Sequence, residues 1–256
     1  MSVITKNADG VFLIGINRAV KKNCVNHQTA VELLAAFQRF NATPELKVAV
    51  LYGEGGTFCA GYDLSEVATG SHVKPDDTAF EEFIEKHRFM GPTNLKLKKP
   101  LIAAVEGYAV AGGLELSLMA DLRVIAEDAT LGVFCRRVGV PLIDGGTVRL
   151  PQIVGLGRTL DIILTGRAVD AAEAHQIGLA NRVVKKGEAV NVAISLAREI
   201  MKHPELCMLT DRRSVFNSLN GSHDEAMKFE YEKGQEVLVE AIQGAQKFTK
   251  RDRSKL

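Results

Sequence analysis

The chain has 256 residues, of which 46% are hydrophobic and 25% are charged, and its formal net charge is +1 at pH 7. A chain of this size and composition buries a sizeable core, so we expect one globular body or a body with a small appendage. The near-neutral charge argues against a nucleic-acid binder, which would need an excess of basic residues to neutralise phosphates.

The first 185 residues alternate between predicted strands and predicted helices. Buried strands are expected at 11–17, 48–55, 101–107 and 121–127, and helices at 27–41 and 79–95 with a polar surface loop at 66–80. This alternation predicts an α/β architecture with parallel strands. Strand signals end near residue 187, and three helices are expected at 187–202, 204–219 and 223–246.

The cysteines and histidines have no metal-ligand spacing. The six histidines form no H-E-x-x-H pattern, and no C-x-x-C pair occurs among the four cysteines, which are Cys24, Cys59, Cys135 and Cys207. We therefore expect reduced thiols and no metal.

Neither a secretory leader nor a membrane span is predicted. The first ten residues, MSVITKNADG, lack the apolar core of a signal peptide. The most apolar stretch, residues 101–120, contains Glu106, Glu115 and a Gly-Gly pair, and charged side chains are expensive in a bilayer.

Two glycine-containing turns suggest an anion site. Gly112 and Gly113 open a helix after a strand, which exposes main-chain N–H groups at the positive end of the helix dipole. The segment TFCAGYDLSE, residues 57–66, also follows a strand and exposes backbone at Ala60 and Gly61. Each turn alone is compatible with a tight bend that binds nothing. Together they offer two N–H groups to one carbonyl oxygen, an arrangement that stabilises an enolate or a tetrahedral oxyanion.

Four long segments, in the same order, resemble the crotonase superfamily, also called the enoyl-CoA hydratase/isomerase family. Residues 16–26 are similar to the N-R-P-x-x-x-N-A opening, with Ala19 in place of proline, and residues 57–66 to the F-C-A-G-x-D-L segment. Residues 98–132 are similar to the glycine-rich signature that ends in G-G-G-x-E-L, with Ala111 at its first glycine, and residues 145–184 continue the resemblance.

The resemblance implies a crotonase-like spiral of ββα units over residues 1–195. Residues 196–256 would form a C-terminal helical region that builds a homotrimer, with a hexamer left open. The implied partner is an acyl-CoA thioester, and no cofactor is expected because coenzyme A enters as part of the substrate.

The resemblance also assigns site residues. The oxyanion hole would be the main-chain N–H groups of Tyr62 and Gly112; because backbone donates, the tyrosine retains this function while its ring reshapes the pocket. Glu115 falls on the first catalytic glutamate, and its apolar neighbours should raise its pKa. Coenzyme A would be bound by Ala60, Asp63 and Leu64, by Cys24 and Val25 on the opposite wall, and by Lys22 near the phosphates.

The second catalytic glutamate of the family is missing, because Cys135 occupies its position. Cys135 is interpreted as a packed thiol, with a thiolate activated by Arg136 and Arg137 as the alternative. These arginines are read as ion-pair residues or as a site for an acyl carboxylate. Asp144 is the replacement acid to test, against the simpler interpretation of an Asp-Gly turn.

These residues leave several activities open. A hydratase that acts in fatty-acid breakdown is the leading interpretation. The alternatives are an enoyl-CoA double-bond isomerase that uses one carboxylate and a catalytically silent acyl-CoA-binding protein. The residues Ser254, Lys255 and Leu256 match the peroxisomal address, so we expect recognition by the import receptor and a peroxisomal location.

Overall fold

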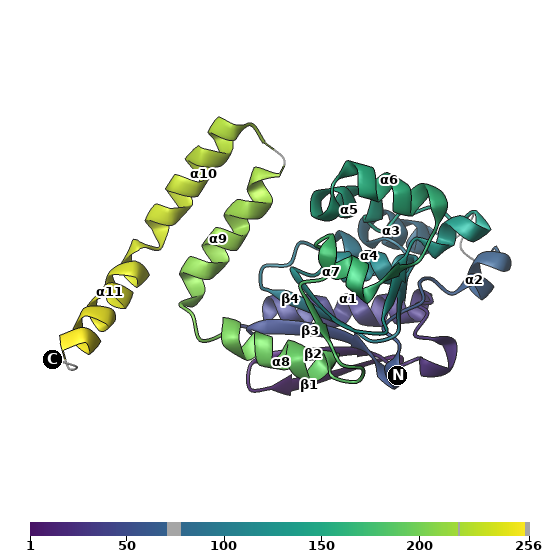
Figure 1. The fold of residues 1–256 in the computed structure, drawn as a ribbon, viewed down its shortest axis with the longest axis horizontal. Helices are drawn as coiled ribbons and strands as arrows, with labels where there is room; N and C mark the ends of the chain where they lie inside the picture. Colours follow the sequence, from purple (N-terminus) through teal and green to yellow (C-terminus); the bar gives the residue numbers. More distant parts are fainter. Residues whose placement is uncertain (71–77, 220, 254–256) are drawn as a thin grey trace. The chain divides into compact units, whose positions relative to one another are not determined.

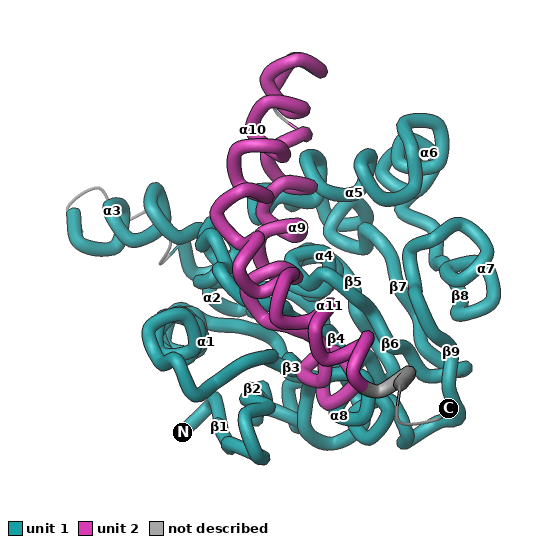
Figure 2. The backbone as a smooth tube through the Cα atoms, turned by 90° about the vertical axis from the view of Figure 1, so that its left-hand side faces the viewer, with its two compact units in different colours: residues 1–197 teal, residues 198–256 magenta. Residues whose placement is uncertain are grey.

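The computed structural model describes residues 1–70, 78–219 and 221–253 (Figure 1). The chain divides into two compact units, residues 1–197 and residues 198–256 (Figure 2). Part of the predicted loop at 66–80 and the whole of the predicted peroxisomal address lie outside the described residues.

The larger sheet forms the base of the first unit. Its order is β1-β2-β3-β4-β6-β9. All neighbours pair in parallel except β1 and β2, which are antiparallel. The strands are β1 (Val3–Ala8), β2 (Val11–Ile16), β3 (Val48–Gly53), β4 (Leu101–Val105), β6 (Leu122–Ala126) and β9 (Arg182–Val184). Within this sheet, the prediction of parallel strands is therefore confirmed from β2 to β9. The strand β1 was not predicted; it is antiparallel to β2 because Asp9 and Gly10 both have positive φ and close a tight hairpin.

A second, three-stranded sheet has the order β5-β7-β8. Its strands are β5 (Tyr108–Val110), β7 (Thr130–Gly132) and β8 (Val169–Asp170). Gly107, with φ of 55°, redirects the chain from β4 into β5, and a helix follows at Gly112. Two consecutive strands in different sheets followed by a helix form one ββα unit, and they bring residue 112 to the end of β5.

Helices α1 to α8 lie around the larger sheet, whose strands β1 to β4 are labelled in Figure 1. Leu33, Phe37 and Phe40 are spaced along one face of α1, and all three are fully buried. The side chain of Asn26 caps this helix by accepting the Thr29 N–H at 3.0 Å. The helices are α1 (His27–Ala42), α2 (Leu64–Ala68), α3 (Thr78–His87), α4 (Gly112–Leu118), α5 (Gly146–Val154), α6 (Leu156–Thr165), α7 (Ala171–Gln176) and α8 (Ala189–Ile200).

The predicted bounds of the loop at 66–80 and of the helix at 79–95 were wrong. The expected loop at 66–80 contains the end of α2 and the start of α3. The expected helix at 79–95 ends at His87, because Arg88 and Gly91 have φ of 72° and 91° and Pro92 then starts a short 3₁₀ turn, η4 (Pro92–Asn94).

The second unit consists of α9 (Glu205–Ser218), α10 (His223–Glu236) and α11 (Leu238–Arg253). The single helix predicted at 223–246 is two helices, because Val237 leaves the helical conformation with ψ of 8°. Ser222 and Glu225 form a capping box that starts α10. Within the described residues, no helix combines the length and apolarity needed to cross a bilayer.

Candidate active site

The two predicted anion-binding turns lie side by side. Cys59 and Ala109 form a parallel bridge, in which Cys59 N donates to Tyr108 O at 2.8 Å and Val110 N donates to Cys59 O at 3.1 Å. Three residues further along each segment, this register brings Tyr62 opposite Gly112. The approach is close, since a Cβ added at Gly61 would lie 3.1 Å from Gly112 N.

The main-chain amides of Tyr62 and Gly112 are available as donors. Neither of them donates a hydrogen bond to another described residue, whereas the neighbouring amides of Asp63 and Ala111 do. Gly112 is also the first residue of α4, where the helix dipole is positive. Two unpaired donors at one location suit an oxygen that gains negative charge.

Ala111 is strained in this turn. Its φ of 53° and ψ of −128° belong to a region that glycine occupies readily and other residues rarely do. Backbone in such a region costs about 1–3 kcal/mol. The conformation places Gly112 N at the head of α4, so the strain accompanies the donor geometry.

Glu115 lies beside these donors. It is only 2% exposed, and its Oε1 accepts the N–H groups of Asp144 and Gly146 at 2.9 and 2.8 Å. Burial and the nearby Asp144 carboxylate raise the pKa of Glu115 to about 7, although the two N–H bonds oppose this. A carboxyl group with this pKa takes up and releases a proton near neutral pH.

Asp144 is next to Glu115 and is 4% exposed. Its Oδ1 accepts the Met90 N–H at 2.9 Å and the Thr93 hydroxyl at 2.6 Å. Burial raises the pKa of Asp144 as well, against the effect of these hydrogen bonds. The structure therefore brings Glu115 and Asp144 together as a carboxyl pair, in which each group affects the proton affinity of the other.

One oxygen of each carboxyl group is free. Among the described residues, Glu115 Oε2 and Asp144 Oδ2 accept no hydrogen bond. In the described part of the chain, every fully enclosed side-chain polar atom has a hydrogen-bond partner except His27 Nδ1. Because the two carboxyl oxygens have no partner, they are not fully enclosed. The pair thus keeps two acceptor atoms for a ligand or water.

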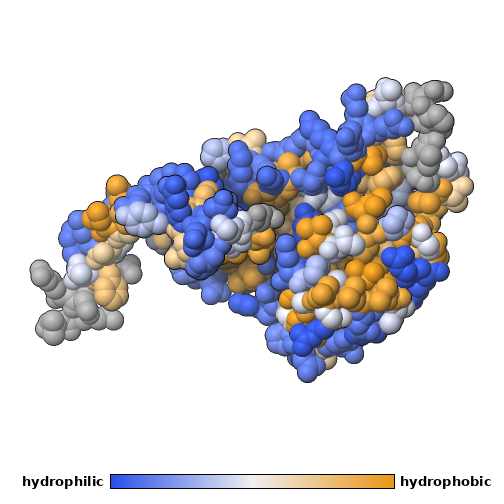
Figure 3. Space-filling view, turned by 90° about the horizontal axis from the view of Figure 1, so that it is seen from above, coloured by the Kyte–Doolittle hydropathy of each residue, from blue (hydrophilic) through white to orange (hydrophobic). Residues whose placement is uncertain are grey.

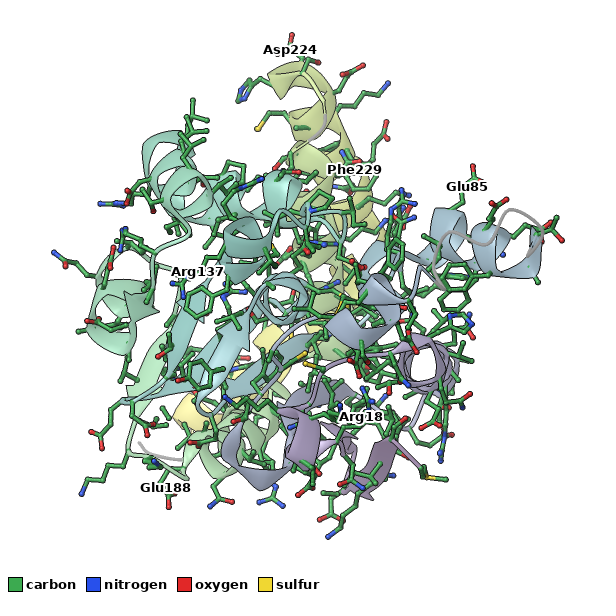
Figure 4. The ribbon with its side chains drawn as sticks, turned by 90° about the vertical axis from the view of Figure 1, so that its right-hand side faces the viewer. Arg18, Glu85, Arg137, Glu188, Asp224 and Phe229 are labelled. Atoms are coloured by element: carbon green, nitrogen blue, oxygen red, sulfur yellow. The ribbon has the colours of Figure 1, made fainter. Side chains whose placement is uncertain are left out.

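Cys135 is a packed thiol near Glu115. It is 7% exposed, and burial and the Glu115 charge raise its pKa. The alternative of an activated thiolate is not supported, since Arg136 and Arg137 are turned to other partners. Arg136 donates to Ile163 O at 3.4 Å; Arg137, labelled in Figure 4, lies 3.6 Å from the Phe134 ring centre and donates to Gly166 O.

The residues predicted to bind coenzyme A lie on two adjacent segments. Ala60 N donates to Lys22 O at 3.0 Å, Val25 N to Gly61 O at 2.8 Å, and Asp63 N to Val25 O at 2.8 Å. Because residues 59–62 also run beside residues 109–112, the predicted coenzyme A residues and the oxyanion donors form one continuous region.

Their side chains differ in accessibility. Lys22 is exposed, with Nζ 5.2 Å from the Tyr108 ring centre, and Leu64 is 51% exposed. Cys24 and Ala60 are half-buried. Val25 is fully buried, and its N–H and C=O groups are paired with Gly61 and Asp63, so it supports this wall without presenting a free group to a ligand.

The Asp63 side chain is occupied by internal partners. Its carboxylate accepts Ser65 N and Ser65 Oγ at the start of α2 and pairs with Arg18 (labelled in Figure 4) at 3.0 Å. Burial acts to raise the pKa of Asp63, but the hydrogen bonds from Ser65 and Arg18 lower it below its ordinary value. Asp63 therefore shapes the turn that carries Tyr62.

The Tyr62 ring belongs to an aromatic cluster. Its hydroxyl donates to Glu66 Oε2 at 2.7 Å, and its ring meets the edge of Phe89 with centres 5.3 Å apart. Phe80 continues the contacts from Phe89 to His27. Burial and Glu66 raise the pKa of Tyr62, so the phenol stays neutral.

Three residues that hold Asp144 were not predicted from the sequence: Met90, Thr93 and Arg149. Arg149 donates to Asp144 O at 3.1 Å and to Thr93 O at 2.5 Å. The sequence around Thr93, G-P-T-N, indicates a turn and gives no sign of an aspartate 51 residues away.

A spiral of ββα units, with paired main-chain donors and a buried glutamate at the head of α4, defines a protein of the crotonase superfamily. The chain belongs to the enoyl-CoA hydratase/isomerase family, whose model matches residues 6–253. It is 31% identical to enoyl-CoA hydratase EchA19 of Mycobacterium tuberculosis, over 94% of this chain and 90% of that protein. It is 36% identical to carnitinyl-CoA dehydratase of Proteus mirabilis, over 73% of this chain and 70% of that protein.

The fold matches solved structures of the same family. A crystal structure of enoyl-CoA hydratase from Mycobacterium tuberculosis H37Rv superposes with a TM-score of 0.88 at 35% identity, covering 98% of this chain and 96% of that chain. The predicted crotonase-like class is thereby confirmed. The chain is an acyl-CoA enzyme of the hydratase/dehydratase type.

Proposed function

We propose that the protein catalyses the reversible hydration of a 2-enoyl-CoA thioester in fatty-acid breakdown. The thioester oxygen would bind between the N–H groups of Tyr62 and Gly112. Negative charge collects on this oxygen when a nucleophile adds at C3, and fixed main-chain dipoles stabilise it without reorganising. The observation that carries the proposal is the location of these two unpaired amides beside the Glu115–Asp144 pair.

The carboxyl pair would divide the proton work. Asp144 accepts a proton from water as its oxygen bonds to C3, and Glu115 delivers its own proton to C2 of the enolate. A proton passing from Asp144 to Glu115 then restores the pair. The raised pKa of Glu115 supports its assignment as the proton carrier.

Coenzyme A would lie along the segments 22–25 and 60–64. The exposed ammonium group of Lys22 suits the phosphates, and the exposed side chain of Leu64 suits an apolar part of coenzyme A. Asp63 contributes through its backbone and its cap on α2, since its carboxylate is already paired with Arg18.

A double-bond isomerase is the second candidate. The observation that favours it is the buried Cys135 thiol at the position of the second glutamate, because an isomerase needs one carboxyl group to remove and return one proton. A single group suffices when the oxyanion donors are retained.

The two candidates separate in a substrate assay. Hydration of 2-trans-enoyl-CoA removes the absorbance of the conjugated thioester, and isomerisation of 3-enoyl-CoA creates it. We expect the first reaction and a loss of about 10²-fold in its kcat in Asp144→Asn, because the base for water is removed. Formation of the conjugated product without hydration, at a rate unaffected by Asp144→Asn, would establish the isomerase instead.

We also propose that the chain assembles as a homotrimer. Large apolar side chains are exposed on the helices of the second unit, and a further patch covers α5 and α6 of the first unit (Figure 3). Apolar surface of this extent indicates association. The residues concerned are Val148, Leu156, Leu160, Leu164, Leu206, Val215, Phe216, Tyr231, Ile242 and Phe248. Light scattering after size exclusion tests this, and a monomeric mass would refute it.

A further inference from the structure

The turn between α3 and β4, which contains η4, holds one oxygen of Asp144. Thr93 is 2% exposed, and its hydroxyl donates to Asp144 Oδ1 at 2.6 Å, next to the Met90 N–H at 2.9 Å. The backbone of this turn packs closely against α1, since a Cβ added at Gly91 would lie 2.2 Å from Ala30 O. Both donors therefore have fixed positions.

Arg149 joins this turn to the loop that carries Asp144. One nitrogen of its guanidinium donates to Asp144 O and another to Thr93 O. A Cβ added at Gly145 would lie 2.1 Å from Arg149 Nη1, so this clamp requires the neighbouring glycine. The hydroxyl of Thr93 and the carboxylate of Asp144 are thus held together from both sides.

We propose that Thr93 is a positioning residue of the acid–base pair, which holds Asp144 by Oδ1, leaves Oδ2 to the substrate and favours the ionised form of Asp144. This inference rests on the proposed function. A hydroxyl that donates to a carboxylate stabilises the charged form. The proton shared by the pair then resides on Glu115, at Oε2, because Oε1 already accepts two N–H bonds.

Charged and titratable groups face Asp144 from several elements. Glu115 approaches from α4, Arg149 from α5, Arg88 from the end of α3, and the Tyr62 phenol from its loop. The charge of Glu115 also acts on the Cys135 thiol. Replacing Thr93 changes none of these groups, so a shift in titration would report the hydroxyl itself.

The test compares Thr93→Val, which removes the hydroxyl and keeps the shape, with Thr93→Ser, which keeps the hydroxyl. For Thr93→Val we expect the acidic limb of the kcat profile to move up by about one pH unit, because a donor to a charged acceptor is lost. KM should stay within twofold, since Thr93 lies outside the predicted coenzyme A region. Thr93→Ser should restore the wild-type profile.

Thr159→Val is the matched control. Thr159 is also buried, at 3% exposure, and its hydroxyl donates to the main-chain oxygen of Gly155. We expect no change in the pH profile for this variant. If Thr93→Val does not fold, Thr93→Ala removes the same donor.

A readout without substrate keeps this inference separate from the proposed function. The carboxyl carbon of Asp144, labelled with ¹³C and assigned with Asp144→Asn, reports its titration by NMR in the free protein. The Asp144 pKa should rise by about one unit in Thr93→Val even if hydration is not the reaction. An unchanged Asp144 titration, or the same kinetic shift in Thr159→Val, would overturn the positioning role.

Discussion

Two buried glutamates from the same apolar stretch, Glu106 and Glu115, show how one local pattern serves two purposes. Each is less than a tenth exposed, and each accepts two main-chain N–H groups from a later segment. Glu106 uses both oxygens, one for Gly187 N at 3.0 Å and one for Ala189 N at 2.9 Å, and so holds the start of α8.

Glu115 concentrates both bonds on Oε1 and keeps Oε2 free, next to a second carboxyl group. Two main-chain donors, the same number as at Glu106, thus fix the position of Glu115 and leave its Oε2 without a partner. Burial with two N–H bonds is therefore insufficient to recognise a reactive carboxyl group. The distribution of those bonds between the two oxygens, together with the neighbouring charge, makes the distinction.

The largest expected effect is a difference in kcat between the variants Glu115→Gln and Glu106→Gln. Removing the proton carrier should lower kcat by about 10³-fold, whereas the variant at 106 should retain kcat within threefold. Steady-state kinetics on the enoyl-CoA substrate, with calorimetric binding of an unreactive acyl-CoA, measures both. Equal losses in the two variants, or full activity of Glu115→Gln, would remove the distinction.

A second effect concerns the pH dependence of stability. The pKa of Glu115 in the folded protein, about 7, lies above its ordinary value of 4.5. The folded state then binds a proton that the unfolded state releases, so this contribution to stability is complete below pH 4.5 and is lost as the pH rises through 7.

Relative to the permanently neutral Glu115→Gln variant, the wild-type protein should lose about 3 kcal/mol of unfolding free energy between pH 4.5 and pH 8. Urea unfolding of both proteins at several pH values tests the sign and the size. A difference that is constant with pH would show that Glu115 titrates normally.

The smallest effect is the loss of stability in Glu106→Gln. An amide presents an acceptor to one N–H group and a donor to the other, so one bond to the start of α8 is lost. We expect about 2 kcal/mol of destabilisation, as for other lost bonds to a charged acceptor. Chemical unfolding at neutral pH measures it, and a change below about 0.5 kcal/mol, typical of surface sites, would speak against a structural role for Glu106.

The sequence predicts the central strands well, because β2, β3 and β4 are almost continuous runs of apolar residues that are buried on both faces. It does not reveal β1, an edge strand in which Val3 is the one buried residue. Nor does it reveal β5, whose three residues are too few for a periodic signal.

The site residues also divide into those that a local sequence pattern predicts and those that it does not. Gly112, Tyr62 and Glu115 belong to continuous motifs, so the resemblance could assign them from short segments. The grip of Thr93 on Asp144 depends on two loops that meet only in the folded chain. Asp144 could be suspected from its position before Gly145, but its partners could not, because no local pattern encodes a contact across that separation.

Main-chain donors in the oxyanion site have a consequence for engineering and for divergence of activity. The backbone register between Cys59 and Ala109 sets the spacing of Tyr62 N and Gly112 N. The residues at 135 and 144 are therefore exchangeable without rebuilding the electrophilic half of the site. A library restricted to these two positions would search new reactions of acyl thioesters on an unchanged scaffold.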